Sequence, residues 1–190
     1  MNNAALTPSR FRDPAILLAG QVNDQMYQAF RSQLDKAPAK GLIVLELTTL
    51  GGDPEVARMI GEDIRFHAEV DPERQFVFLG KAAIYSAGTT LMSFYRRENR
   101  YLTPGTRLMI HERQNKDCMV RLEGPLTSAV PVLKAKLHEM ETAIEIQNEG
   151  FFNLVEGSSV TREEVVRRAT SNWYINAEEA VTLGLVRAVI

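Results

Sequence analysis

The strand–turn–helix unit that decides the fold reads LIVLELTTLGGDPEVARMIGEDIRFHAE, residues 42–69. Its first part, residues 42–47, is apolar except for Glu46, as expected for a strand that is covered on both faces. From Pro54 to Glu69 apolar and charged residues alternate at helical spacing, and Asp53 and Pro54 supply cap and first-turn signals. A strand followed at once by a helix predicts one βα unit.

The same switch between strand and helix patterns recurs along the chain. A further helix is predicted from Asp24 to Ala37. Short apolar runs predict strands at residues 15–22, 42–47, 75–80, 106–111 and 185–190. Repeated βα units of this kind predict an α/β fold around a largely parallel sheet.

Residues 126–151 have a different pattern. Leu126, Val130, Leu133, Leu137, Met140 and Ile144 follow one another at alternating steps of 4 and 3, Gln147 takes the next slot, and Phe151 continues the stripe. This pattern fits an ordinary amphipathic helix on the sheet, and its narrowness also fits a helix that pairs with another helix. We expect one domain over residues 1–190, with a head at about 15–124 and 157–190 and a projecting handle helix at about 126–156.

Two capped helices are predicted after the handle. Thr161 and Glu164 form a capping box for the first, and Asn176 caps the second, which ends at Gly184.

Composition excludes several kinds of function. The formal net charge is -2, which argues against nucleic acid or an anionic membrane as partner. No apolar run approaches the roughly 20 residues that span a bilayer, and the start lacks a secretory signal, so we expect a cytoplasmic protein. The single cysteine, Cys118, excludes an internal disulfide, and His67, His111 and His138 lack metal-ligand spacing. We therefore expect neither a metal nor another cofactor.

Three features could carry chemistry. The paired glycines of TTLGGDP, residues 48–54, would expose backbone N–H groups to an oxyanion, although a Gly-Gly pair also fits an ordinary turn. Ser86 in GKAAIYSAGTTLM, residues 80–92, stands between a buried strand and an apolar helix among small neighbours, where a simple N-cap serine would also fit. His111 closes a strand, at the edge where sheet enzymes place their sites, and could equally be a surface histidine.

The order of these features resembles that in the Clp protease proteolytic subunit family, which are ring-forming serine peptidases. In that family a Gly-Gly turn, a serine in an A-S-x-G-like context and an M-I-H histidine follow one another in this order. The matching segments here are TTLGG (48–52), IYSAG (84–88) and LMIH (108–111), followed by INAEEAVTLGLV (175–186) in the C-terminal motif. The resemblance extends from about Ile16 to the end of the chain.

This resemblance implies the fold shared by Clp peptidases and crotonases. It implies Ser86 as the nucleophile, His111 as its general base, and the N–H groups of Gly52 and Ala87 as the oxyanion hole. The substrates would be peptides or unfolded polypeptides, cut inside an oligomeric chamber without a metal or nucleotide. Self-association into rings and docking of an ATP-dependent unfoldase are the partners that the family implies.

The chain departs from the family at two informative positions. Leu50 stands where the family usually has a proline before the glycines. The family's catalytic aspartate falls on Asn172, which could orient the imidazole but could not stabilise imidazolium by charge. An ordinary turn residue would explain Asn172 nearly as well. Asp117, Glu112 and Glu178 are the carboxylates that could replace the missing charge.

Three other functions remain open from the sequence. A crotonase-type acyl-CoA enzyme would use the glycine turn without a serine nucleophile. A serine–lysine peptidase would use Lys81 as the base. A catalytically impaired ring subunit would bind or gate an active partner, and Asn172 is the residue that suggests it.

Overall fold

The computed structural model describes residues 6–114 and 123–190. Asp117 and Cys118 lie outside these residues. A seven-stranded sheet runs in the order β1-β2-β3-β4-β7, with β5 paired to β3 and β6 paired to β5. All pairs are parallel except β5 with β6. Its strands are β1 Ile16–Ala19, β2 Gly41–Thr49, β3 Arg74–Tyr85, β4 Arg100–Leu102, β5 Arg107–Ile110, β6 Trp173–Asn176 and β7 Ala188–Val189.

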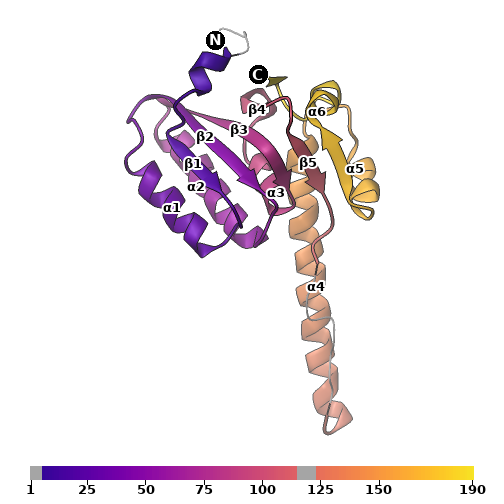
Figure 1. Cartoon of the computed structure of the whole chain (residues 1–190). Helices are drawn as coiled ribbons and strands as arrows, with labels where there is room; N and C mark the ends of the chain where they lie inside the picture. Colours follow the sequence, from indigo (N-terminus) through magenta and orange to yellow (C-terminus); the bar gives the residue numbers. More distant parts are fainter. Residues whose placement is uncertain (1–5, 115–122) are drawn as a thin grey trace.

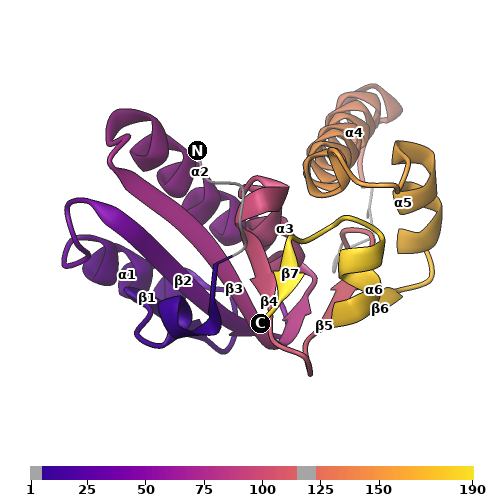
Figure 2. The same cartoon turned by 90° about the horizontal axis from the view of Figure 1, so that it is seen from above.

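The helices that cover the sheet follow the βα order expected from the sequence. They are α1 Asp24–Leu34, α2 Pro54–Val70, α3 Ala87–Ser93, α4 Leu126–Val155, α5 Arg162–Ala169 and α6 Ala177–Thr182, and a short 3-10 helix, η1, covers Pro8–Phe11. Figure 1 shows α4 extending well beyond the head, and Figure 2 shows α1 and α2 on one side of the molecule with α4 and α5 on the other. Within residues 6–114 and 123–190, no helix is both long and apolar enough to cross a bilayer.

The two faces of β2 belong to two apolar clusters. Ile43, Leu45 and Leu47 point into the large core shared with the helices, whereas Val44, between them, belongs to a smaller cluster with Phe11 of η1. Successive side chains of a strand point to opposite faces, so a continuous apolar run is required where both faces are covered. Both faces of this central strand are therefore buried, as its sequence predicts.

β3 is the strand that positions the site. Residues 78–80 of β3 pair with β4 and residues 83–85 pair with β5, and Ala82, at the change of partner, has a φ of 56°. The sequence predicts only residues 75–80 of this strand. Because the continuation to Tyr85 carries it to β5, the residue that follows, Ser86, lies beside the end of the strand that precedes His111.

Several expected boundaries were wrong. The runs at residues 15–22 and 185–190 form only the short strands β1 and β7, and β4 and β6 were not predicted at all. α1 begins at Asp24, as predicted, and Asn23 caps it by accepting the Met26 N–H. The expected caps at Asp53, Thr161 and Asn176 are confirmed, since each side chain accepts a backbone N–H of the first helical turn.

The free edge of β1 is occupied by a side chain. The Leu17 N–H donates to Gln33 Oε1 over 2.7 Å, and Gln33 Nε2 donates to the Leu17 carbonyl over 3.1 Å. The primary amide of Gln33, on α1, thus takes the pair of hydrogen bonds that a neighbouring strand would make with Leu17.

Arg100 joins the ends of two helices inside the core. Its side chain is fully buried, and all its hydrogen bonds to the described residues go to backbone carbonyls, those of Tyr95, Leu154, Leu185, Ser93 and Asn153, over distances of 2.6 to 3.3 Å. These carbonyls include the C-terminal residue of α3 and residues in the last turn of α4. Burial lowers the pKa of Arg100 to about 10, so the guanidinium is still charged at neutral pH.

Candidate active site

Ser86 occupies a strained turn between β3 and α3. Its φ of 53° and ψ of -115° are rarely adopted by a residue with a side chain. The turn is held because the Ser86 N–H donates to the Met109 carbonyl of β5 over 2.8 Å, while Thr89 and Thr90 donate to the Ser86 carbonyl. A serine at a sharp strand-to-helix turn presents its hydroxyl outward. The hydroxyl of Ser86 is not used to cap α3.

His111 faces this hydroxyl. His111 Nε2 lies 2.7 Å from Ser86 Oγ, and both residues are partly exposed. His111 directly follows β5, whose pairing with β3 places Met109 opposite Tyr85. With the ring proton on Nδ1, the serine O–H donates to Nε2, which is the arrangement needed for general-base activation.

The paired glycines form a turn close to Ser86. A Cβ atom on Gly51 would lie 2.8 Å from Ser86 Cβ and 3.3 Å from Ser86 Oγ, and one on Gly52 would overlap the Val22 backbone. Both residues also have positive φ, 110° and 149°. Only glycine therefore fits at either position.

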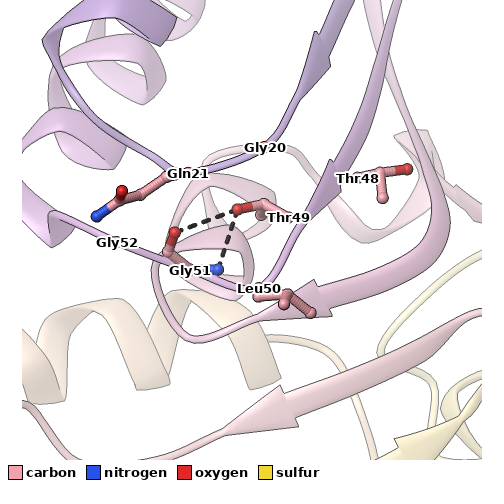
Figure 3. Close-up of a pocket in the computed structure, with 7 residues that line it drawn as sticks. All are labelled: Gly20, Gln21, Thr48, Thr49, Leu50, Gly51 and Gly52. Atoms are coloured by element: carbon pink, nitrogen blue, oxygen red, sulfur yellow. Dashed lines mark hydrogen bonds between the residues drawn. The ribbon is translucent and has the colours of Figure 1, made fainter.

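Within the described residues, two backbone donors near Ser86 have no hydrogen-bond acceptor, one in the glycine turn and one at the start of α3. The Gly51 N–H donates to Thr49 Oγ1, whereas the Gly52 N–H makes no hydrogen bond within the described part of the chain. Ala87 is the first residue of α3, so its N–H has no acceptor inside the helix. These are the two donors expected from the sequence. The turn borders an open hollow of about 520 Å³ lined by Gly20, Gln21, Thr48, Thr49, Leu50, Gly51 and Gly52 (Figure 3).

Asn172 lies next to His111 along the sheet. β6 pairs with β5 so that Trp173 is opposite Ile110, and Asn172 and His111 are the next residues beyond this pair. Across residues 6–114 and 123–190, however, no side chain is hydrogen bonded to His111 Nδ1. Asn172 is exposed, with a φ of 54°, a conformation that asparagine tolerates better than most residues. Asn172 is therefore both a turn residue with positive φ and the neighbour of His111 across the β5–β6 pair.

The other candidate partners lie elsewhere. Lys81 Nζ lies 2.7 Å from Glu46 Oε2, so the lysine is engaged in an ion pair away from the serine, which argues against a serine–lysine peptidase. Glu112 and Glu178 are exposed, and neither is hydrogen bonded to His111.

Arg113 connects the segment after His111 to two helices. Its guanidinium lies 2.7 Å from Glu55 in the first turn of α2, and its backbone N–H donates to Gln147 Oε1 of α4 over 2.6 Å. Partial burial raises the pKa of Glu55, but hydrogen bonds from Arg113 and Arg58 outweigh it and hold this pKa below its ordinary value. No local sequence pattern predicts a contact between residues so far apart in the chain.

The strained serine, the facing histidine and the two backbone donors are the groups that a serine hydrolase needs. The Clp protease family model matches residues 4–190, and the chain belongs to that family. The family consists generally of serine peptidases, which makes the chain a peptidase subunit of the ClpP type.

Individual relatives are similar over most of their length. The ATP-dependent Clp protease proteolytic subunit 2 of Pseudomonas aeruginosa is 25% identical over 177 residues, which are 92% of this chain and 80% of that protein. Subunit 2 of Gluconobacter oxydans is 26% identical, over 95% of this chain and 75% of that one. An Asn-to-Asp mutant of ClpP1 from Listeria monocytogenes superposes with a TM-score of 0.69 at 19% identity, covering 92% of this chain and 90% of the other. The predicted fold class is confirmed.

Proposed function

We propose that this chain is a serine endopeptidase that hydrolyses peptide bonds of short or unfolded polypeptides inside an oligomeric chamber. The contact of 2.7 Å between Ser86 Oγ and His111 Nε2, at a strained serine beside two unpaired N–H groups, is the observation that carries the proposal. Neither an N-cap serine nor a surface histidine needs this geometry. A crotonase-type enzyme has no use for such a pair either.

The reaction follows from these groups. Ser86 Oγ attacks the amide carbonyl carbon while His111 Nε2 takes the hydroxyl proton, and the N–H groups of Gly52 and Ala87 stabilise the negative oxygen. The C–N bond then breaks as His111 returns the proton to the leaving amine. Water, deprotonated by His111, next attacks the acyl ester, and the carboxylic acid leaves as Ser86 is restored.

A fluorophosphonate probe with mass-spectrometric readout tests the assignment. We expect the wild type to be labelled at Ser86, Ser86→Ala to be unlabelled, and His111→Ala to be labelled far more slowly, because the unassisted hydroxyl is a weak nucleophile. Thr90→Ala, at a neighbouring hydroxyl of the same helix, serves as the control and should be labelled like the wild type. Equal labelling of Ser86→Ala would overturn the proposal.

A second function is favoured by one observation. Asn172 is exposed and makes no hydrogen bond to His111, so a catalytically impaired subunit that joins an active ring is the alternative. Co-purification with an active partner, together with no turnover by the chain alone, would decide for this alternative. In the main proposal the assembly is a ring of this chain in the cytoplasm, supplied with substrate by an ATP-dependent unfoldase.

A further inference from the structure

We infer that Thr49 is a positioning residue that fixes the relative place of the two oxyanion donors; the inference rests on the proposed peptidase function. Thr49 is the last residue of β2, is 2% exposed, and lies just before the glycine turn. Its side chain contacts both elements that carry a donor: the hydroxyl contacts the turn, and the methyl group contacts α3.

The hydroxyl holds the Gly51 peptide groups from both sides. The Gly51 N–H donates to Thr49 Oγ1 over 3.0 Å, and the Thr49 hydroxyl donates to the Gly51 carbonyl over 3.3 Å (Figure 3). The same carbonyl accepts the Val22 N–H. With its N–H directed to Thr49, Gly51 cannot serve as the oxyanion donor, and the next N–H, that of Gly52, is left for that purpose.

The methyl group meets the other donor element. A Cβ on Gly88 would lie 2.6 Å from Thr49 Cγ2, so this methyl packs directly against the backbone of the first turn of α3. Gly88 follows Ala87, the second donor, and Ser86 precedes both. One side chain therefore spans the gap between the glycine turn and the start of the nucleophile's helix.

The turn needs such a contact because its own sequence does not stiffen it. Residue 50 is leucine, whose φ is not fixed by a ring as that of proline is, and its side chain is 75% exposed. Two consecutive glycines add further backbone freedom. The Gly51 carbonyl belongs to the same peptide group as the Gly52 N–H. Without the Thr49 hydroxyl, this carbonyl would keep only the hydrogen bond from Val22, so the direction of the Gly52 N–H would be held less firmly.

Substitutions can separate the hydroxyl from the methyl group. Thr49→Val keeps the shape and removes both hydrogen bonds, whereas Thr49→Ser keeps the hydroxyl. Thr106→Val is the matched control, because the buried Thr106 hydroxyl also donates to a backbone carbonyl, that of Gly80, over 3.0 Å, and Thr106 does not line the hollow beside the turn. The readouts are kcat and KM for a fluorogenic peptide, and the amide hydrogen exchange rate of Gly51 in each full-length protein.

We expect Thr49→Val to lower kcat about 10- to 100-fold with KM nearly unchanged, since a misdirected oxyanion donor weakens transition-state binding alone. The Gly51 amide should exchange faster in this variant. Thr49→Ser, which keeps the hydroxyl and loses only the methyl group, should leave Gly51 exchange unchanged and lower kcat less than Thr49→Val does, and Thr106→Val should behave like the wild type. A wild-type kcat in Thr49→Val, or an equal fall in Thr49→Ser, would overturn the inference.

The exchange measurement separates this inference from the proposed function. If the wild type neither turns over peptide nor reacts with the fluorophosphonate, the peptidase proposal fails. Even in that case, faster exchange of the Gly51 amide in Thr49→Val would support the inference that Thr49 holds the glycine turn. Unchanged exchange would contradict this inference.

Discussion

Asn172 occupies the place next to His111 but contributes no hydrogen bond to it. We predict that Asn172→Asp raises kcat for a peptide substrate at least tenfold, because a carboxylate there would stabilise the imidazolium that forms during attack. Replacing the aspartate of a Ser-His-Asp enzyme by asparagine lowers turnover by a factor on the order of 10⁴. The reverse change, Asn172→Asp, can therefore recover part of that factor. Aspartate, like asparagine, tolerates the positive φ of this residue.

The variant Asn172→Ala shows whether the asparagine side chain already contributes to turnover. If the amide already orients the imidazole, this variant should be slower than the wild type. An unchanged or lower rate in Asn172→Asp, with an intact circular dichroism spectrum, would contradict the prediction and favour another carboxylate or an impaired subunit.

Arg100 is the residue on which we expect the stability of the head to depend most. Arg100→Met leaves several buried carbonyls without their donor, and each unsatisfied group costs about 1–3 kcal/mol. We therefore predict a loss of about 3 kcal/mol or more in the free energy of unfolding in urea. Arg107→Met, at an exposed arginine of β5, is the control and should change stability by less than about 0.5 kcal/mol. Equal stability of the two variants would show that the buried network is dispensable.

At the scale of elements, the long and strongly patterned segments were predictable. β2, α2 and α4 have apolar patterns that extend over many residues. Such long patterns predict a strand or a helix from the local sequence alone. β4 and β6 were missed because each has only a few residues and is held in place by a neighbouring strand rather than by its own pattern. The extension of β3 past Gly80 was missed because a strand that changes partners leaves no periodic signal.

The site was predictable in part because its main residues directly follow predicted strands. The Gly-Gly turn, Ser86 and His111 each follow a strand, and the ends of parallel strands meet at one edge of a sheet. Thr49 and Arg113 act through contacts with residues distant in the sequence, so no local pattern marks them. The position of Thr49, two residues before the paired glycines, is the sequence signal that could have identified it.

The apolar stripe of α4 divides at its C-terminal end. Leu126, Leu137 and Ile144 are 85%, 57% and 53% exposed, whereas Phe151 is only 8% exposed and lies in the core. Phe151 therefore anchors the helix to the head instead of continuing the exposed stripe. Gln147, in the stripe before Phe151, accepts the Arg113 N–H through Oε1 within the chain.

At the scale of the whole molecule, the exposed stripe predicts assembly. Contiguous apolar surface of this kind usually marks an interface, and we predict a closed homo-oligomer larger than a dimer, a stack of rings with the stripe buried between subunits. Replacing Leu137 and Met140 together by glutamate should split the assembly into smaller, folded species. Sedimentation velocity and circular dichroism measure the two parts of this outcome.

Lys134→Glu together with Glu141→Lys changes charge on exposed residues of the same helix outside the stripe and should leave the assembly intact. Unfolding of the Leu137 and Met140 variant would mean that the stripe packs on its own chain. A wild-type protein that sediments as a folded monomer at micromolar concentration would contradict the prediction.

The amide of Gln33 on the β1 edge has a consequence for how these molecules can associate wrongly. An unprotected outer strand is a template on which a second molecule can add its own strand, which is the first step toward fibrils. In this chain an invading strand would first have to break both bonds between Gln33 and Leu17. Two molecules that meet at this edge therefore do not present open β1 strands that are ready to aggregate.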